Sequence, residues 1–152
     1  MSSPIVRLAP FAKGFFAILQ DLIGIALRIW MTRVFFLSGL VKLRSWDTTI
    51  SLFENEYDVP LLSPEIAAYL ATAAELGFSA LLLVGFGGRF AAFGLFILNI
   101  VAATSYPDIS EAGVKEHYYW GAMLAILIAY GPGRAALDTL ILRACKARYG
   151  LK

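Results

Sequence analysis

The sequence has very little that could hold a metal or form a disulfide. It contains one cysteine and one histidine in 152 residues. A single thiol cannot form an intrachain disulfide or a CxxC redox pair. One histidine cannot supply both axial ligands of a haem, and no residues have the spacing of a zinc or iron–sulfur site. The sequence therefore predicts no haem, iron–sulfur or zinc site in this chain.

Charged residues are scarce as well. They make up 16% of a chain that is 59% hydrophobic, and the mean hydropathy is +0.71. A soluble domain of this size typically carries about 25% charged residues. The net charge of +2 gives no case for nucleic-acid binding. The start, MSSPIVRLAPFAKG, lacks the charged, apolar and small-residue order of a cleaved signal peptide. This composition predicts a one-domain integral membrane protein whose first helix directs insertion.

Four apolar segments are long enough to be membrane spans. A helix needs about 20 mainly apolar residues to cross a hydrocarbon core of about 30 Å. We expect spans at about 22–43, 64–86, 89–106 and 117–133, the last stopping at Pro132. Ser63 and Pro64 have the residue types that begin helices, and the short turn GFGGR requires an antiparallel hairpin. The predicted fold class is all-α, an integral membrane four-helix bundle.

Three flanking segments are predicted to be short interfacial helices. The first is the N-terminal stretch PFAKGFFAILQD, which needs a bend before the first span. The second is the loop after the first span, where four apolar residues share one helical face and form either a lid or a plain seal: Trp46, Ile50, Phe53 and Tyr57. The third is the tail at 134–149, with a stripe of Leu137, Leu140, Ile141, Ala144 and Cys145 beside Arg143, Lys146 and Arg148.

The orientation follows from lysine and arginine in the short loops. The N-terminal piece, the turn carrying Arg89 and the basic tail belong to one side, and the two longer, acidic loops belong to the other. Both termini are therefore expected to be cytoplasmic.

Three polar residues fall near the middle of three different spans. They are Arg33, Glu75 and Asn99. A charge at the bilayer centre costs about 2.5–3.5 kcal/mol on insertion scales, so these side chains should point into the bundle. We expect Arg33 to pair with Glu75 and Asn99 to hydrogen-bond to either. Such a pair either fixes the helix register, with no necessary gain in stability, or forms a pocket for a ligand head group or a proton.

Other polar residues lie toward the ends of the spans. Lys42 and His117 are placed at the outer mouth of this pocket, and Arg28 lies nearer the cytoplasm, where it either snorkels or meets Asp21.

Three stretches together resemble the DoxX family of small four-helix membrane proteins. They are RVFFLSGLVKL, AAELGFSALLLVGFGGRFAA and HYYWGAMLAILIAYGPGRAALD, and the likeness covers roughly residues 22–140. The resemblance implies a four-helix bundle in the bacterial inner membrane. Members of this family and of the related DoxD group are associated with redox at the membrane, including subunits of a thiosulfate:quinone oxidoreductase, and with oxidative or metal stress. By position, the polar part of the likeness is carried by Arg33, Lys42, Glu75, Arg89 and His117.

Two functions are consistent with these observations. The first is a subunit of a quinone-linked oxidoreductase, in which Glu75 carries the quinol proton while His117 and Lys42 bind a quinone oxygen or an anionic sulfur species. The second is a non-catalytic membrane anchor or assembly factor, whose basic tail docks a partner or anionic lipid. A transporter is a weaker third, since four spans are few. The expected partners are membrane lipids and either a partner protein or further copies of the chain.

Overall fold

The computed structural model describes residues 4–131 and 133–150, with side chains from residue 12 onward. Within these ranges every element of regular secondary structure is an α-helix, which confirms the predicted all-α class. The helices are α1 (Pro4–Arg44), α2 (Trp46–Asn55), α3 (Pro64–Val84), α4 (Gly88–Thr104), α5 (Glu111–Tyr130) and α6 (Leu137–Tyr149). The predicted end of the fourth span, Pro132, lies outside the described residues.

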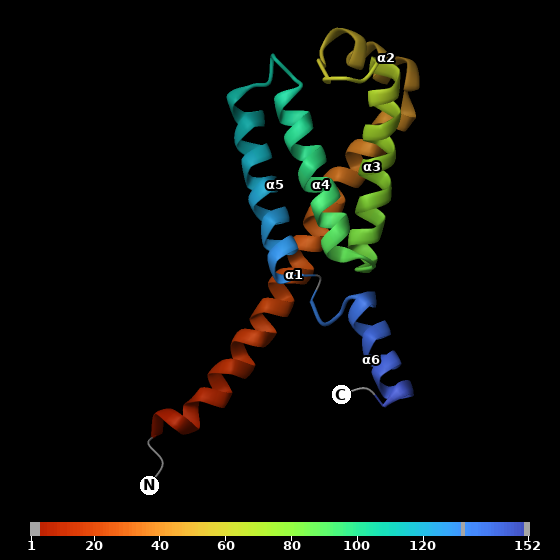
Figure 1. Ribbon diagram of the computed structural model, residues 1–152. Coiled ribbons are helices and arrows are strands. Elements are labelled where there is room, and N and C mark those ends of the chain that lie inside the picture. The colour runs from red at the N-terminus through yellow and green to blue at the C-terminus, as the bar shows by residue number, and fades with distance from the viewer. Residues whose placement is uncertain (1–3, 132, 151–152) are drawn as a thin grey trace.

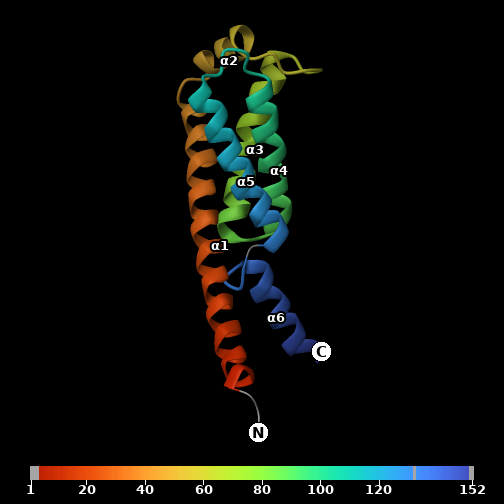
Figure 2. The ribbon, with the colours of Figure 1, turned by 90° about the vertical axis from the view of Figure 1, so that its left-hand side faces the viewer.

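Four of these helices pack into a bundle. α1 packs on α3, α3 on α4, α4 on α5, and α5 returns to α1. Figures 1 and 2 show α2 lying across one end of this bundle, while α6 projects beyond the other. We call these the α2 end and the α6 end. The start of α1 and the end of α6 both lie beyond the α6 end (Figure 1).

The predicted helix signals around α3 are confirmed. The Ser63 hydroxyl accepts a hydrogen bond from the Ile66 amide at 3.4 Å, and Pro64 occupies the first helical position. α3 ends at Gly85, whose φ of +74° is a conformation that favours glycine. Gly87, with φ of +56°, is the N-cap residue directly before α4. The GFGGR segment is therefore the tight antiparallel turn that its length required.

The predicted separate N-terminal interfacial helix is wrong. α1 is one continuous helix of 41 residues, about 60 Å long at 1.5 Å per residue. No proline occurs between residues 11 and 44, so nothing in the sequence forces the break that we expected from length alone. α1 runs well past the other bundle helices at the α6 end (Figure 2).

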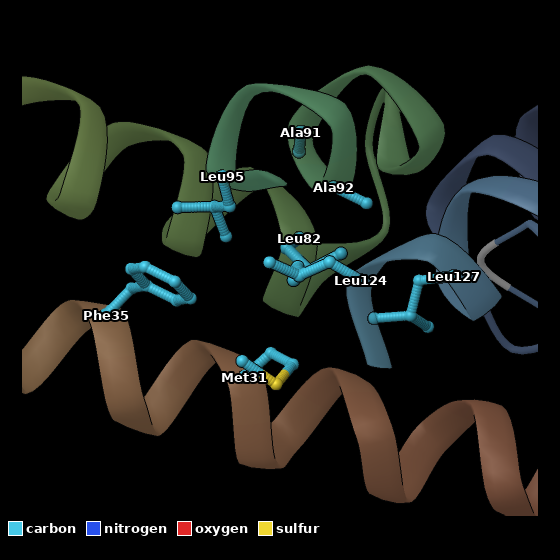
Figure 3. Close-up of a cluster of buried hydrophobic side chains, with 8 residues drawn as sticks. All are labelled: Met31, Phe35, Leu82, Ala91, Ala92, Leu95, Leu124 and Leu127. Atoms are coloured by element: carbon cyan, nitrogen blue, oxygen red, sulfur yellow. The ribbon is translucent and has the colours of Figure 1, made fainter. Parts of the chain in front are cut away.

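The main core lies where the four bundle helices meet (Figure 3). It is built from side chains of all four: Met31, Phe35, Leu82, Ala91, Ala92, Leu95, Leu124 and Leu127. A second cluster, Phe53 with Ala67 and Ala68, holds α2 on the start of α3. Trp46, Ile50 and Tyr57 pack against it. The predicted apolar face of the segment at 46–57 is confirmed.

Two described helices are long and apolar enough to cross a membrane. They are the part of α1 from Ala12 to Arg44 and α3, whereas α4 is apolar but shorter. The predicted tail helix is present as α6, and none of its residues is buried. Leu140 and Ile141 of its predicted stripe are exposed.

Candidate functional site

A buried ion pair joins α1 to α3. Lys42 Nζ lies 2.7 Å from Oε1 and 2.9 Å from Oε2 of Glu75. The Ser38 hydroxyl donates to Glu75 Oε1 at 3.1 Å and accepts from Lys42 Nζ at 2.9 Å. Only 8% of Glu75 is exposed. This triad satisfies both charges in a place where unpaired charges would be strongly unfavourable.

The helices approach closely at this point because α1 carries a glycine there. A Cβ atom on Gly39 would lie 2.8 Å from the Leu76 side chain and 3.2 Å from Glu75 Cβ. Ser38 and Lys42 are four residues apart on the same face of α1. The buried face of α3 is unusually polar, with Thr72 and Ser79 one turn on either side of Glu75. The local sequences of both helices therefore build the triad.

The predicted pairing of Arg33 with Glu75 is wrong. Arg33 is exposed, and its guanidinium carbon lies 5.9 Å from the centroid of the Trp30 ring. At 3.6 residues per turn, Arg33 and Lys42 point about 180° apart around α1. Because Lys42 faces α3, Arg33 must face away from it.

Asn99 is buried, as expected, but the expected hydrogen bond to Arg33 or Glu75 is wrong. It links α4 to α5 by donating from Nδ2 to the His117 carbonyl at 3.0 Å, while Oδ1 lies 2.8 Å from His117 Nδ1. Since the donation to a carbonyl fixes the amide orientation, Oδ1 accepts and Nδ1 carries the proton. The His117 ring also lies edge-on to Trp120, with centroids 4.9 Å apart.

The α6 end holds Arg28, Arg89 and Arg134. One expectation was that Arg28 pairs with Asp21, and this is wrong. Arg28 Nε donates to the Leu82 carbonyl at 3.0 Å, and its Nη2 donates to the Leu83 carbonyl. These carbonyls end α3, where a cation is favourable. Asp21 pairs with Arg134 instead, at 3.4 Å. Arg89 donates to the Ala129 carbonyl at 3.3 Å.

Of the six predicted site residues, the structure therefore joins Lys42 to Glu75 and Asn99 to His117, and leaves Arg33 and Arg89 apart from both.

A groove of about 510 Å³ runs between α3 and α4 and includes the ion pair in its wall. Its size lies within the range of small-molecule sites. Most of its lining is aliphatic or aromatic, and Leu70, Phe90, Phe93 and Ile97 are side chains that are also exposed on the outside of the bundle. The groove therefore joins an apolar outer flank to a single buried ion pair. His117 does not line it.

The segment after α2 closes the groove at the α2 end, through residues whose role the sequence did not reveal. Tyr57 lines the groove, and its ring stacks between Phe53 and Tyr106 at centroid distances of 4.9 and 5.1 Å. Burial, and next the negative charge of Glu75, raise the pKa of Tyr57. The sequence placed Tyr57 on the apolar face of a helix, but gave no sign that it would approach Glu75.

Ser105, at the end of α4, also lines the groove. Its carbonyl accepts from the Asp58 amide at 2.8 Å, which ties the segment after α2 to α4. Its buried hydroxyl has no hydrogen-bond partner in the described part of the chain. Buried polar atoms are nearly always satisfied, so this hydroxyl suits a site completed by a polar ligand or water.

The donor set at this site suits oxygen atoms of an organic ligand. Lysine, serine and tyrosine donate hydrogen bonds, and a carboxylate accepts them or holds a proton. Over residues 4–131 and 133–150, no three His, Cys, Asp or Glu side chains lie together as metal ligands would. Cys145 is exposed on α6.

These features define an all-helical bundle protein with two helices able to cross a membrane and an amphiphile-sized groove beside a buried ion pair. The sequence profile of the DoxX family, whose members are membrane-associated, matches residues 24–107, which include Lys42, Glu75 and the whole of α3 and α4. The chain belongs to the DoxX family. It is 33% identical over 135 residues to an uncharacterized protein of Haemophilus influenzae, covering 83% of this chain and 87% of that protein. No solved structure matches it.

Proposed function

We propose that this chain is an integral membrane subunit of a redox system and binds a quinone or quinol in the groove between α3 and α4. In this proposal α1, α3, α4 and α5 cross the bacterial inner membrane. The α6 end lies in the cytoplasm, because it carries most of the basic residues of the short connections and of the tail. The α2 end then faces outward.

The observation that carries the proposal is the combination of an apolar groove with one buried ion pair. A quinone is an amphiphile, with an apolar tail and a ring that bears two oxygens. Its tail fits the flank formed by Leu70, Phe90 and Phe93, and its ring oxygens suit the ammonium of Lys42. Ionisable residues at membrane depth are functional sites by default, because their insertion is unfavourable.

Lys42 and Glu75 take separate roles in this proposal. The three N–H groups of Lys42 are used by Ser38 and by the two oxygens of Glu75, so on binding Lys42 redirects the N–H held by Ser38 to a ring oxygen. Glu75 holds or releases a proton beside it. Ser38 positions both, since it bonds to each of them. A bound quinone supplies the redox chemistry, taking up two electrons and two protons. The electrons come from a partner protein or a reduced sulfur compound, which links the chain to sulfur-compound oxidation or to oxidative or metal stress. Catalytic and binding roles for His117 and Arg89 stay predictions.

A second candidate function is a non-catalytic membrane anchor or assembly factor. It is favoured by the same triad, since Ser38, Lys42 and Glu75 already satisfy one another and hold α1 on α3. It is also favoured by α6, whose exposed face carries Arg143, Lys146 and Arg148, a charge pattern suited to anionic lipid or to an acidic partner.

Quantifying bound quinone separates the two candidates. Wild type, Glu75→Gln and the control Arg33→Gln are purified in mild detergent, and their lipids are extracted and identified by mass spectrometry. The control removes a charge from α1 outside the groove. We expect near-stoichiometric quinone in wild type and Arg33→Gln, and depleted quinone in a Glu75→Gln variant that still folds. A folded wild type without enriched quinone contradicts the redox proposal and leaves the anchor.

A further inference from the structure

Tyr57 approaches the proposed quinone groove from a different part of the chain than the ion pair. Lys42 and Glu75 line the groove from α1 and α3, whereas Tyr57 lines it from the segment that follows α2. Its ring is held by stacking on Phe53 and Tyr106. Tyr106 is in turn fixed by donating its hydroxyl proton to Glu56 Oε2 at 3.0 Å. The ring of Tyr57 is therefore held in place on both faces.

The hydroxyl of Tyr57 is available to a ligand. Tyr106 and Glu56 satisfy each other, but the Tyr57 hydroxyl makes no hydrogen bond to any group of residues 12–131 and 133–150. Burial and the charge of Glu75 raise the pKa of Tyr57. The Tyr57 hydroxyl is therefore a protonated hydrogen-bond donor at neutral pH. Tyr57 therefore offers a rigidly held hydrogen-bond donor, in a groove of ligand size, that suits recognition of a polar head group.

The unpartnered hydroxyl of Ser105 is a second observation in the same part of the groove. Ser105 lines the groove, is 2% exposed, and is tied through its carbonyl to Asp58, the residue after Tyr57. The groove thus has unused polar groups at the α2 end in addition to the satisfied ion pair.

We propose that Tyr57 is a specificity-determining residue that donates a hydrogen bond to one ring oxygen of the ligand, while Lys42 redirects the N–H that it gives Ser38 to the other. This inference rests on the proposed quinone function and deepens it. Two donors from separate elements favour a ring with two oxygens over an amphiphile with a single head-group oxygen. The segment after α2 is then part of the binding site, and not only a seal on the end of the bundle.

The test compares two ligands on two tyrosine variants. Decylubiquinone carries two ring carbonyls, and 4-decylphenol carries one ring oxygen on a similar tail. Equilibrium binding of each is measured on the purified full chain in detergent for wild type, Tyr57→Phe and Tyr118→Phe. Tyr118→Phe is the matched control, because it removes a hydroxyl from an exposed tyrosine of α5 outside the groove.

We expect Tyr57→Phe to bind decylubiquinone about 3- to 10-fold more weakly, the loss of one neutral hydrogen bond. Its affinity for 4-decylphenol should equal that of wild type, and Tyr118→Phe should match wild type for both ligands. Equal affinity of wild type and Tyr57→Phe for decylubiquinone overturns the inference while leaving the quinone site in place. Absence of saturable decylubiquinone binding by wild type overturns the proposed function itself.

An infrared measurement keeps the inference testable if Tyr57→Phe folds poorly. In wild type the two carbonyl stretches of bound decylubiquinone should both shift to lower frequency than in detergent alone, because each accepts a hydrogen bond. If only one carbonyl shifts, the inference is contradicted.

Discussion

Lys42 Nζ contacts both carboxylate oxygens of Glu75, at 2.7 and 2.9 Å, and this contact joins α1 to α3 beside the groove. The desolvation cost of burying such a pair is offset by the hydrogen bonds within it. Removing one partner leaves the other charge buried and unpaired. The relationship between these two residues is therefore both a structural element and the polar part of the proposed binding site.

The first prediction concerns the partner of Glu75. Lys42→Met should lower the free energy of unfolding in detergent by about 3–5 kcal/mol, because Glu75 is left buried and unpaired. The double variant Lys42→Met/Glu75→Leu should recover much of this loss. Chemical or thermal unfolding followed by circular dichroism gives the values. Arg33→Met is the control and should change stability by less than about 0.5 kcal/mol, as exposed substitutions usually do. If Arg33→Met lowers the free energy of unfolding strongly and Lys42→Met does so only slightly, then Glu75 pairs with Arg33 and not with Lys42.

The second prediction concerns the link between α4 and α5. Asn99→Leu removes both hydrogen bonds to His117 and should destabilise the protein by about 1–2 kcal/mol. Thr104→Val, also on α4, is the control, since Thr104 bonds only to carbonyls of its own helix. Both variants are compared by thermal unfolding. Equal melting temperatures would show that the contact adds nothing to helix association.

The third prediction concerns the close approach of α3 and α4. A Cβ atom on Gly94 would lie 2.5 Å from the Phe78 ring, and both residues line the groove. Gly94→Ala should therefore displace Phe78, destabilise the protein by about 1–3 kcal/mol and weaken binding in the groove. Gly77→Ala is the matched control, because a Cβ there meets nothing within 4 Å. It should be neutral or stabilising by up to about 1 kcal/mol. If Gly94→Ala is as stable as Gly77→Ala and binds ligand equally well, the packing argument is wrong.

The fourth prediction concerns the attachment of α6. Asp138 accepts from the amides of Gly87 and Gly88 at 3.0 and 3.1 Å, and so caps the start of α4 from the start of α6. Asp138→Ala should lose about 0.5–2 kcal/mol of capping energy and release α6. Trypsin should then cleave faster at Arg143, Lys146 and Arg148 in limited proteolysis. Asp138→Asn, which keeps an acceptor oxygen, should fall between wild type and Asp138→Ala. Identical cleavage rates in all three would show that the cap does not hold α6.

The fifth prediction concerns alkaline pH. Burial, with a smaller contribution from Glu75, raises the pKa of Tyr57, and the hydrogen bond to Glu56 raises the pKa of Tyr106. A raised tyrosine pKa means that the folded protein keeps a proton which the unfolded chain has lost. The resulting stability is fully present below about pH 10, the ordinary tyrosine pKa, and is lost as the pH rises through the raised value.

This titration can be followed by the absorbance of tyrosinate. Tyr57→Phe should remove a late step from the titration curve of the folded protein. Glu75→Gln should shift that step to lower pH, because it removes the negative charge. A curve unchanged by Tyr57→Phe would show that Tyr57 ionises with the exposed tyrosines.

Local signals in the sequence were sufficient for much of the fold. The Ser63–Pro64 start, the glycine turn between α3 and α4 and the apolar face of the segment at 46–57 are confirmed, because each depends on neighbouring residues alone. The expected depth in the membrane predicted burial correctly for Glu75 and Asn99 but not for Arg33, which is exposed.

The pairings were not predictable in the same way. Two residues at equal depth meet only if their helices turn the same faces toward each other, and Arg33 and Lys42 lie on opposite faces of α1. The face is set by the main core, where Met31 and Phe35 point into the bundle, and by the close contact at Gly39. The approach of Tyr57 to Glu75 depends on how a loop folds back over the bundle, which no periodicity encodes.

The most direct test of the account is to find where a quinone binds. A photoreactive azido-quinone is irradiated with the purified protein in detergent, and the labelled residues are located by mass spectrometry, with and without excess decylubiquinone. We expect labelling that excess decylubiquinone abolishes and that is confined to the groove-lining stretches of α3, α4 and the segment after α2. This labelling should be strongly reduced in a folded Glu75→Gln variant. Labelling that excess decylubiquinone does not abolish, or labelling centred on α6 or on the Arg33 face of α1, would contradict it.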